Sequence, residues 1–169
     1  TDKKFIPVLH QIKSRTPKNF HIINDSALKI QEANIIDGRY TIVANLPYGI
    51  STLLIVKWIK KLHLIDKIIV MLQKEVADRI TAQVSTQSYG RLSVLVQFVC
   101  DYELLFNVDP ESFFPVPKVT SSMIQLKPKK KLPTIKEINN IEKICKLLFS
   151  FRRKKIKKSL QHICKNPKD

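Results

Sequence analysis

The fold of this chain is most constrained by a near-continuous apolar run at residues 65–72, in the middle of its 169 residues. A run of this length, rich in isoleucine and valine, predicts a strand that is buried on both faces of a sheet. A membrane-spanning helix takes about 20 apolar residues, so this run is far too short to cross a bilayer. We therefore expect a central strand of a folded domain and no membrane span.

Segments of two kinds alternate around this run. Apolar and β-branched residues predict further strands at residues 20–23, 40–44 and 121–126. Helical spacing of apolar residues predicts helices at residues 5–12, 51–59, 74–82, 135–150 and 152–164. Residues 92–106 predict a helix followed by a strand that begins near Tyr102. This alternation is typical of an α/β fold with a parallel sheet and helices on both faces, in which ligands bind at the carboxyl ends of the strands.

The positive charge is concentrated at the C-terminal end. The formal net charge is +16, and residues 127–169 hold 15 Lys or Arg against three Asp or Glu. Such a field suits a phosphate backbone or an anionic membrane surface, and a solvated lysine-rich tail is the alternative without a partner. No tryptophan lies there, which favours RNA over a membrane. The cations predicted to contact RNA are Lys118, Arg152, Arg153, Lys154, Lys155, Lys157 and Lys158.

Three widely spaced cysteines, Cys100, Cys145 and Cys164, bear on the compartment and on metal binding. Their odd number indicates no disulfide framework, and no pair has the spacing of metal ligands. We expect a reduced cytoplasmic compartment and no bound metal. We also expect two parts, an α/β domain over residues 1–128 and a small basic helical subdomain over residues 129–169.

A four-residue motif, Asn45-Leu46-Pro47-Tyr48, directly follows the strand predicted at residues 40–44. An amide at a strand end is suited to holding an exocyclic amine. The Asn45 oxygen and the Leu46 carbonyl can accept its two hydrogens, which directs the nitrogen lone pair toward an electrophile. Pro47 holds the turn, and Tyr48 offers a ring face on which a base can stack. Taken alone, the same residues are at least as typical of a strand-terminating turn with a packed tyrosine.

A second aromatic segment favours the chemical interpretation. Residues 113–119 (FFPVPKV) combine two aromatic rings with a stiff proline segment. An adenine flipped out of its RNA would lie between Tyr48 and an aromatic ring of this segment. Attack by a base amine requires no general base beforehand, since the proton can leave after the methyl group arrives.

In these segments the chain resembles the KsgA-type family of small-subunit ribosomal RNA adenine dimethyltransferases. The resemblance extends in order and spacing over essentially the whole chain. It rests on residues 45–52 (NLPYGIST), 71–79 (MLQKEVADR), 89–94 (YGRLSV), 113–119 and 121–122. The NLPY motif is shared with other N6-methyltransferases, whereas the second and third segments are far more specific.

The resemblance implies a Rossmann-like, S-adenosylmethionine-dependent methyltransferase fold with a small helical C-terminal domain. It also implies transfer of two methyl groups to each of two adjacent adenosines near the 3′ end of small-subunit rRNA, in ribosome biogenesis. Asn45 matches the family's amine-orienting asparagine, Tyr48 its stacking tyrosine and Phe113 its second aromatic, with Phe114 as a neighbour able to substitute. The expected catalytic set is Asn45, Leu46, Pro47, Tyr48 and Phe113.

The chain departs from the family pattern at the cofactor. The glycine-rich loop and the ribose-binding glutamate of the family are expected upstream of Thr1, and the helical domain is expected to continue beyond Asp169. In the adenine-binding loop, an ungapped match places Ser26 where the family has an aspartate, with Asp25 before it. Either side chain can accept the cofactor's amino group. The expected cofactor contacts are Asp25, Ser26, Ala27 and Asn45.

Two other functions remain open from the sequence. The first is a non-catalytic RNA-binding assembly or transcription factor on the same scaffold, although a pure binder has no use for the amine-orienting Asn45. The second is a large-subunit rRNA adenine methyltransferase, which shares the NLPY motif. Residues 89–94 and the basic tail favour the small-subunit family. We expect the partner to be small-subunit rRNA or the assembling small ribosomal subunit, and the protein to be a monomer.

Overall fold

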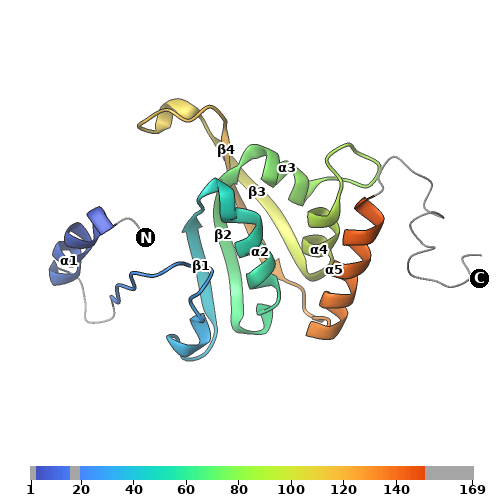
Figure 1. Cartoon of the computed structure of the whole chain (residues 1–169), viewed down its shortest axis with the longest axis horizontal. Coiled ribbons are helices and arrows are strands. Elements are labelled where there is room, and N and C mark those ends of the chain that lie inside the picture. The colour runs from blue at the N-terminus through green and yellow to red at the C-terminus, as the bar shows by residue number, and fades with distance from the viewer. Residues whose placement is uncertain (1–2, 16–19, 151–169) are drawn as a thin grey trace, which may run out of the picture. The chain divides into compact units, whose positions relative to one another are not determined.

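A computed structural model describes residues 3–15 and 20–150 of the chain (Figure 1). The chain forms two compact units, Thr1–Asp37 and Gly38–Asp169. The helix predicted at residues 152–164 lies outside the described residues, and so do six predicted RNA-binding cations: Arg152, Arg153, Lys154, Lys155, Lys157 and Lys158.

In its described residues, the first unit has the α-helix α1 (Ile6–Arg15) after a 3-10 turn at Lys3–Phe5, and a second 3-10 turn at Glu32–Asn34. The helix predicted at residues 5–12 is therefore confirmed, with its end three residues later. The strand predicted at residues 20–23 is wrong, because these residues have no regular secondary structure. An apolar run becomes a strand only where a neighbouring strand completes its hydrogen bonds. Every strand of the described sheet begins at Tyr40 or later.

The second unit is built on a four-stranded sheet in the order β1-β2-β4-β3 (Figure 1). The strands are β1 (Tyr40–Asn45), β2 (Ile65–Gln73), β3 (Cys100–Val108) and β4 (Ser121–Pro128). β1 and β2 are parallel, whereas β4 is antiparallel to both β2 and β3. β1, β2 and β3 therefore run in one direction, and their carboxyl ends meet at the upper edge of the sheet in Figure 1.

The mixed sheet corrects the expectation of a purely parallel one. β4 lies between β2 and β3 and runs against both. The physical reason is the connection that precedes it. Residues 109–120 contain only a 3-10 turn, Pro110–Ser112, and no crossover helix. A chain that returns without crossing the sheet pairs antiparallel to the strand it has just left.

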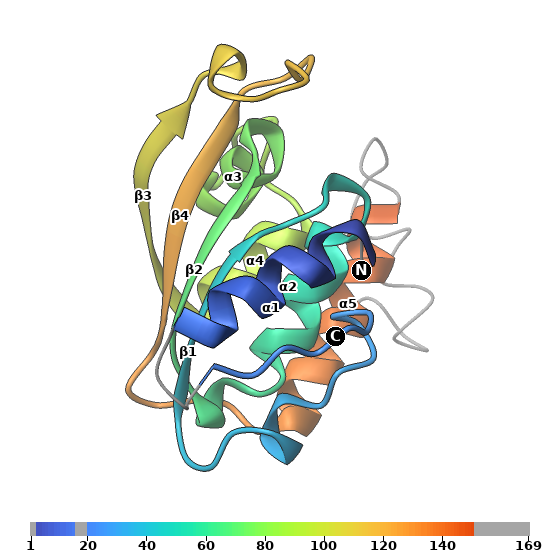
Figure 2. The same ribbon diagram turned by 90° about the vertical axis from the view of Figure 1, so that its left-hand side faces the viewer.

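The described α-helices of this unit lie on one face of the sheet (Figure 2), whereas the sequence pattern predicts helices on both faces. They are α2 (Ser51–Ile59), α3 (Lys74–Thr81), α4 (Arg91–Val99) and α5 (Ile135–Ser150). α4 packs against α2, α3 and α5. All four predicted helices are confirmed, and the strand expected near Tyr102 begins at Cys100. No helix among the described residues is long and apolar enough to cross a membrane.

The core fills the space between the sheet and these helices. Alternate residues of β2 and β4, such as Ile68, Val70 and Ile124, are 0% exposed. They are covered by apolar residues of α2 and α4, among them Ile55 and Val96, also 0% exposed. Burying each such side chain contributes about 1.5–3 kcal/mol to the stability of the fold. The strand ends that carry the candidate site are therefore held by a well-packed core. The domain boundary predicted at residue 128 stays a prediction.

Candidate active site

The carboxyl end of β1 positions the NLPY motif. Asn45 is the last residue of β1 and stands in register with Met71 of β2. The Leu46 amide donates a hydrogen bond to the Met71 carbonyl at 3.2 Å, and the Leu46 side chain is only 4% exposed. The motif is thus anchored to the sheet, while the Asn45 side chain is exposed at its edge.

Pro47 and Tyr48 turn the chain from the strand into α2. Tyr48–Ile50 forms a 3-10 turn, in which the Ile50 amide donates to the Pro47 carbonyl at 3.2 Å. The Ser51 hydroxyl donates to the Tyr48 carbonyl at 3.1 Å, which holds the Tyr48 backbone. The Tyr48 side chain is nevertheless 38% exposed, so it is not the fully packed tyrosine of a purely structural turn.

The NLPY motif and the proline segment line one cavity of about 360 Å³, which we call the base cavity. Its size lies within the range of small-ligand sites, about 300–1,000 Å³. The structure therefore brings together the five predicted catalytic residues, although Phe113 lies far from the other four in the sequence. The lining residues are Asn45, Leu46, Pro47, Tyr48, Met71, Phe113, Phe114, Pro115 and Pro117.

Sequence reasoning missed Met71 as a member of this cavity. Only the register of β1 against β2 places it beside Asn45, and that pairing is not visible in the sequence. The base cavity is lined by apolar, aromatic and amide groups, with no charged side chain. In the described part of the chain, the Asn45 side-chain amide has no hydrogen-bond partner, so its oxygen is available to a ligand's N–H. This arrangement can hold a planar base and accept the hydrogens of its amine.

A second hollow, of about 780 Å³, lies between α3, α4 and α5, and we call it the cationic hollow. Its charged lining residues are Arg79, Arg91, Lys146 and a single acid, Glu75. Among the described residues, none of the three cations forms an ion pair. The pKa of the neighbouring Cys145 thiol is raised by burial, and the positive charge of Arg91 offsets part of this rise. Sequence reasoning did not group these three cations, because they come from three separate helices.

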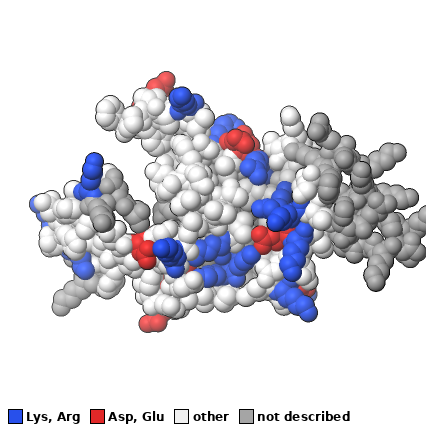
Figure 3. Space-filling view, viewed as in Figure 1, with Lys and Arg blue, Asp and Glu red and all other residues white. Residues whose placement is uncertain are grey.

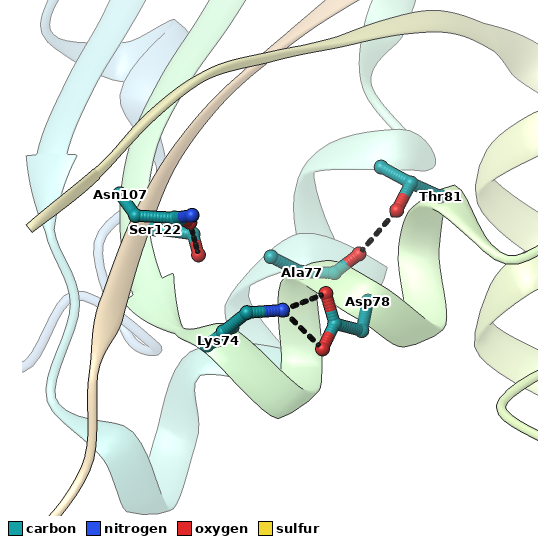
Figure 4. A network of polar contacts seen from close by, with 6 residues as sticks. All are labelled: Lys74, Ala77, Asp78, Thr81, Asn107 and Ser122. Atoms are coloured by element: carbon teal, nitrogen blue, oxygen red, sulfur yellow. Dashed lines mark hydrogen bonds and ion pairs between the residues drawn. The ribbon is translucent and has the colours of Figure 1, made fainter.

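A third hollow, of about 420 Å³, adjoins the cationic hollow. It shares Glu75 and Ser88 with the cationic hollow, and its residues Lys118–Thr120 follow directly on Pro117 of the base cavity. Lys74 in this hollow is paired with Asp78, with both oxygens 2.8 Å from Nζ (Figure 4). Lys118, the one predicted RNA-binding cation within the described residues, is exposed here and has no ion pair among them. Lys and Arg side chains also gather over α2 and α5 in Figure 3.

The predicted cofactor contacts are divided between the two units. Asp25, Ser26 and Ala27 belong to the first unit, whereas Asn45 belongs to the second. The Ser26 amide donates to Asp25 Oδ1 at 2.6 Å, and the Lys29 amide donates to the Ser26 carbonyl at 2.8 Å. The Asp25 side chain is exposed. In the described ranges, no group of three His, Cys, Asp or Glu is placed to hold a metal ion.

Comparison with known proteins connects this site to a family. The sequence model of the ribosomal RNA adenine dimethylase family matches residues 1–168. The chain belongs to this family. It is 40% identical over 165 residues to the Ribosomal RNA small subunit methyltransferase A of Wolbachia pipientis wMel, covering 96% of this chain and 57% of the relative. It is 37% identical over 161 residues to the protein of the same name from Pelagibacter ubique, covering 94% and 62%.

Solved structures show the same fold as this dimethylase-family chain. A dimethyladenosine transferase from Plasmodium falciparum superposes with a TM-score of 0.78 at 28% identity, covering 95% of this chain and 57% of that one. The 23S rRNA methyltransferase ErmE superposes with a TM-score of 0.72 at 25% identity, covering 95% and 64%. The Rossmann-like methyltransferase fold and the family resemblance are therefore confirmed. The chain spans about 57 to 62% of the length of its two relatives named above.

Proposed function

We propose that the protein is an S-adenosylmethionine-dependent methyltransferase that dimethylates N6 of two adjacent adenosines near the 3′ end of small-subunit rRNA. The observation that carries the proposal is the base cavity, where the free amide of Asn45 and the rings of Tyr48 and Phe113 line the same space. Family membership supports an rRNA adenine as the substrate. The names of the relatives favour the small subunit over the large-subunit alternative.

The lining residues divide the work of capture and orientation. Tyr48 and Phe113 hold the flipped base by stacking, worth about 1–3 kcal/mol per base. The Asn45 oxygen and the Leu46 carbonyl accept the two amine hydrogens, so that the lone pair of N6 points away from them. The bound cofactor supplies an electrophilic methyl group. With no acid or base in the cavity lining, the amine proton leaves to solvent after attack.

The residues of the first unit suit the adenine end of the cofactor. Asp25 presents an exposed carboxylate, one oxygen of which is engaged by the Ser26 amide. Its other oxygen, or the Ser26 hydroxyl, can accept a hydrogen bond from the adenine amino group. We propose that Asp25, Ser26 and Ala27 contact the cofactor, and that Asn45 does so as well.

The distribution of cations around the cavity indicates where the RNA backbone would bind. Lys118 lies next to the proline segment, in a hollow that adjoins the cationic hollow. Within the described residues, the three cations of the cationic hollow form no ion pair. We propose that these groups bind RNA phosphates, and that the basic residues 152–158 also bind RNA phosphates. The proposed partner is the assembling small ribosomal subunit. That the protein acts as a cytoplasmic monomer without a metal also remains a proposal from the sequence.

The decisive test is Asn45→Ala in the full-length protein. Methyl transfer to rRNA should fall by about 100-fold or more, the effect of removing one preorganised polar contact to a reacting group. RNA affinity should stay within about twofold, because Asn45 contacts the amine and no phosphate. Asn107→Ala is the matched control, an exposed amide at the end of β3 that is hydrogen-bonded to Ser122 outside the cavity. Methyl transfer by Asn45→Ala at the wild-type rate would contradict the proposal. A loss of RNA affinity as large as the loss of methyl transfer would show that Asn45 is a binding residue.

A further inference from the structure

The Tyr48 phenol is tied to a strand that the NLPY motif does not contain. Its hydroxyl lies 3.2 Å from the hydroxyl of Ser121, and either group can donate. The Tyr48 carbonyl is held independently by Ser51. The ring is therefore fixed at both ends, at its backbone and at its oxygen, while 38% of the side chain stays exposed.

Ser121 is a rigid anchor for this contact. It is the first residue of β4, stands opposite Gln73 of β2 and Val108 of β3, and is 1% exposed. The residue before it, Thr120, accepts a hydrogen bond from the Lys74 amide at 2.9 Å. A hydroxyl held between two strands cannot follow the tyrosine if the ring turns. Breaking the contact therefore releases the ring and leaves the anchor in place.

The neighbouring serine shows that this contact is specific to Ser121. Successive side chains in a strand point to opposite faces. Ser122 is also 1% exposed, and its hydroxyl donates to Asn107 Oδ1 at 2.7 Å (Figure 4). Of these two buried hydroxyls, only that of Ser121 touches a wall of the base cavity.

We infer that Ser121 is a positioning residue for methyl transfer, which fixes the Tyr48 ring in the orientation that receives the flipped adenine. This inference rests on the proposed function and adds a residue to it. Ser121 follows the proline segment that carries Phe113, so the hydrogen bond ties Tyr48 to the strand into which this segment leads. The base then meets two preset surfaces and does not have to order them itself, which is the condition for a productive geometry.

The experiment compares Ser121→Ala, Tyr48→Phe and the double variant in the full-length protein acting on its rRNA substrate. A neutral hydrogen bond is worth about 0.5–1.5 kcal/mol, so each single change should lower kcat about three- to tenfold. KM for the RNA should change less than about twofold, because phosphate contacts lie elsewhere. The double variant should be no slower than the slower single variant, because both changes remove the same bond. Ser122→Ala is the control that removes an equally buried hydroxyl.

A spectroscopic measurement distinguishes a positioning role of Ser121 from a purely structural one. RNA with 2-aminopurine at the target position reports stacking through quenched fluorescence. Tyr48→Phe keeps the ring and the fold, yet it should raise the fluorescence of the bound probe, as should Ser121→Ala. Additive losses in the double variant, or unchanged quenching in both single variants, would overturn the inference. If Asn45→Ala is inactive while Tyr48→Phe and Ser121→Ala keep full rate, only this inference fails. If Asn45→Ala is fully active, both the proposed function and the inference about Ser121 fail.

Discussion

At the scale of single residues, the base cavity contains two adjacent phenylalanines in unlike surroundings. The Phe113 side chain is half-buried, whereas that of Phe114 is 100% exposed. A ring held by packing presents one face to a ligand without losing further freedom on binding, whereas a free ring has to be ordered first. The structure therefore supports the sequence-based choice of Phe113 as the second stacking surface, a role that stays a prediction.

We expect Phe113→Ala to slow methyl transfer about tenfold or more, in line with the loss of about 1–3 kcal/mol of stacking. Phe114→Ala should slow it less than about threefold, because this ring lacks packing to hold it against a base. Single-turnover rates on the rRNA substrate would compare the two variants. If Phe114→Ala proved the slower of the two, the roles of the adjacent rings would have to be exchanged.

At the scale of elements, α5 begins with a reciprocal pair of hydrogen bonds. The Thr134 amide donates to Glu137 Oε2 at 2.7 Å, and the Glu137 amide donates to the Thr134 hydroxyl at 3.2 Å. This is the capping box that satisfies the free amides of a first helical turn. The bonds from Thr134 lower the pKa of Glu137 below its ordinary value of 4.5. The helix that carries Lys146 into the cationic hollow is thus fixed at its start.

Thr134→Ala should lower the free energy of unfolding by about 1 kcal/mol at pH 7, the usual effect of removing an N-cap hydroxyl. Because the pKa of Glu137 is depressed in the folded state, its stabilisation is complete above about pH 4.5 and is lost as the pH falls through the lower folded value. The difference from wild type should therefore narrow below pH 4.5. Urea unfolding at several pH values would measure this, with Thr134→Ser as the variant that keeps the cap. A difference constant from pH 3 to 7 would show that Glu137 takes no part.

At the scale of the whole molecule, the net charge of +16 comes from the cations of the cationic hollow as well as from the basic C-terminal residues. Arg79, Arg91 and Lys146 come from three helices and surround one hollow without partners of their own among the described residues. Unpaired cations in a concave surface concentrate the positive potential there. The proposed RNA path therefore depends on the packing of α3, α4 and α5 as much as on the composition of the chain.

Changing Arg79, Arg91 and Lys146 together to Gln should flatten the plot of log K for RNA against log salt by about 2 units, since each phosphate contact contributes about 0.7–0.9. Lys136→Gln is the control, an exposed lysine in the first turn of the same α5 helix. It should change the slope by less than about one unit. Filter binding over a salt series would measure both. An unchanged slope in the triple variant would mean that the hollow is solvated and binds no phosphate.

The sequence by itself determined the features that depend on neighbouring residues. Alternation of apolar runs and helical spacing located four helices of the second unit and every strand of its sheet, because these patterns follow from local backbone geometry. The NLPY and FFPVPKV segments indicated their chemistry for the same reason, since each carries its aromatic ring and its rigid proline within a few residues.

Only the tertiary structure decided the features that depend on pairing between distant segments. The direction of β4, the place of Met71 beside Asn45 and the bond from Tyr48 to Ser121 all follow from strand order and register. The run at residues 20–23 has a strand-like composition and no strand, because composition does not supply a neighbour to complete its hydrogen bonds. The cationic hollow likewise exists only because three helices meet, which no local pattern records.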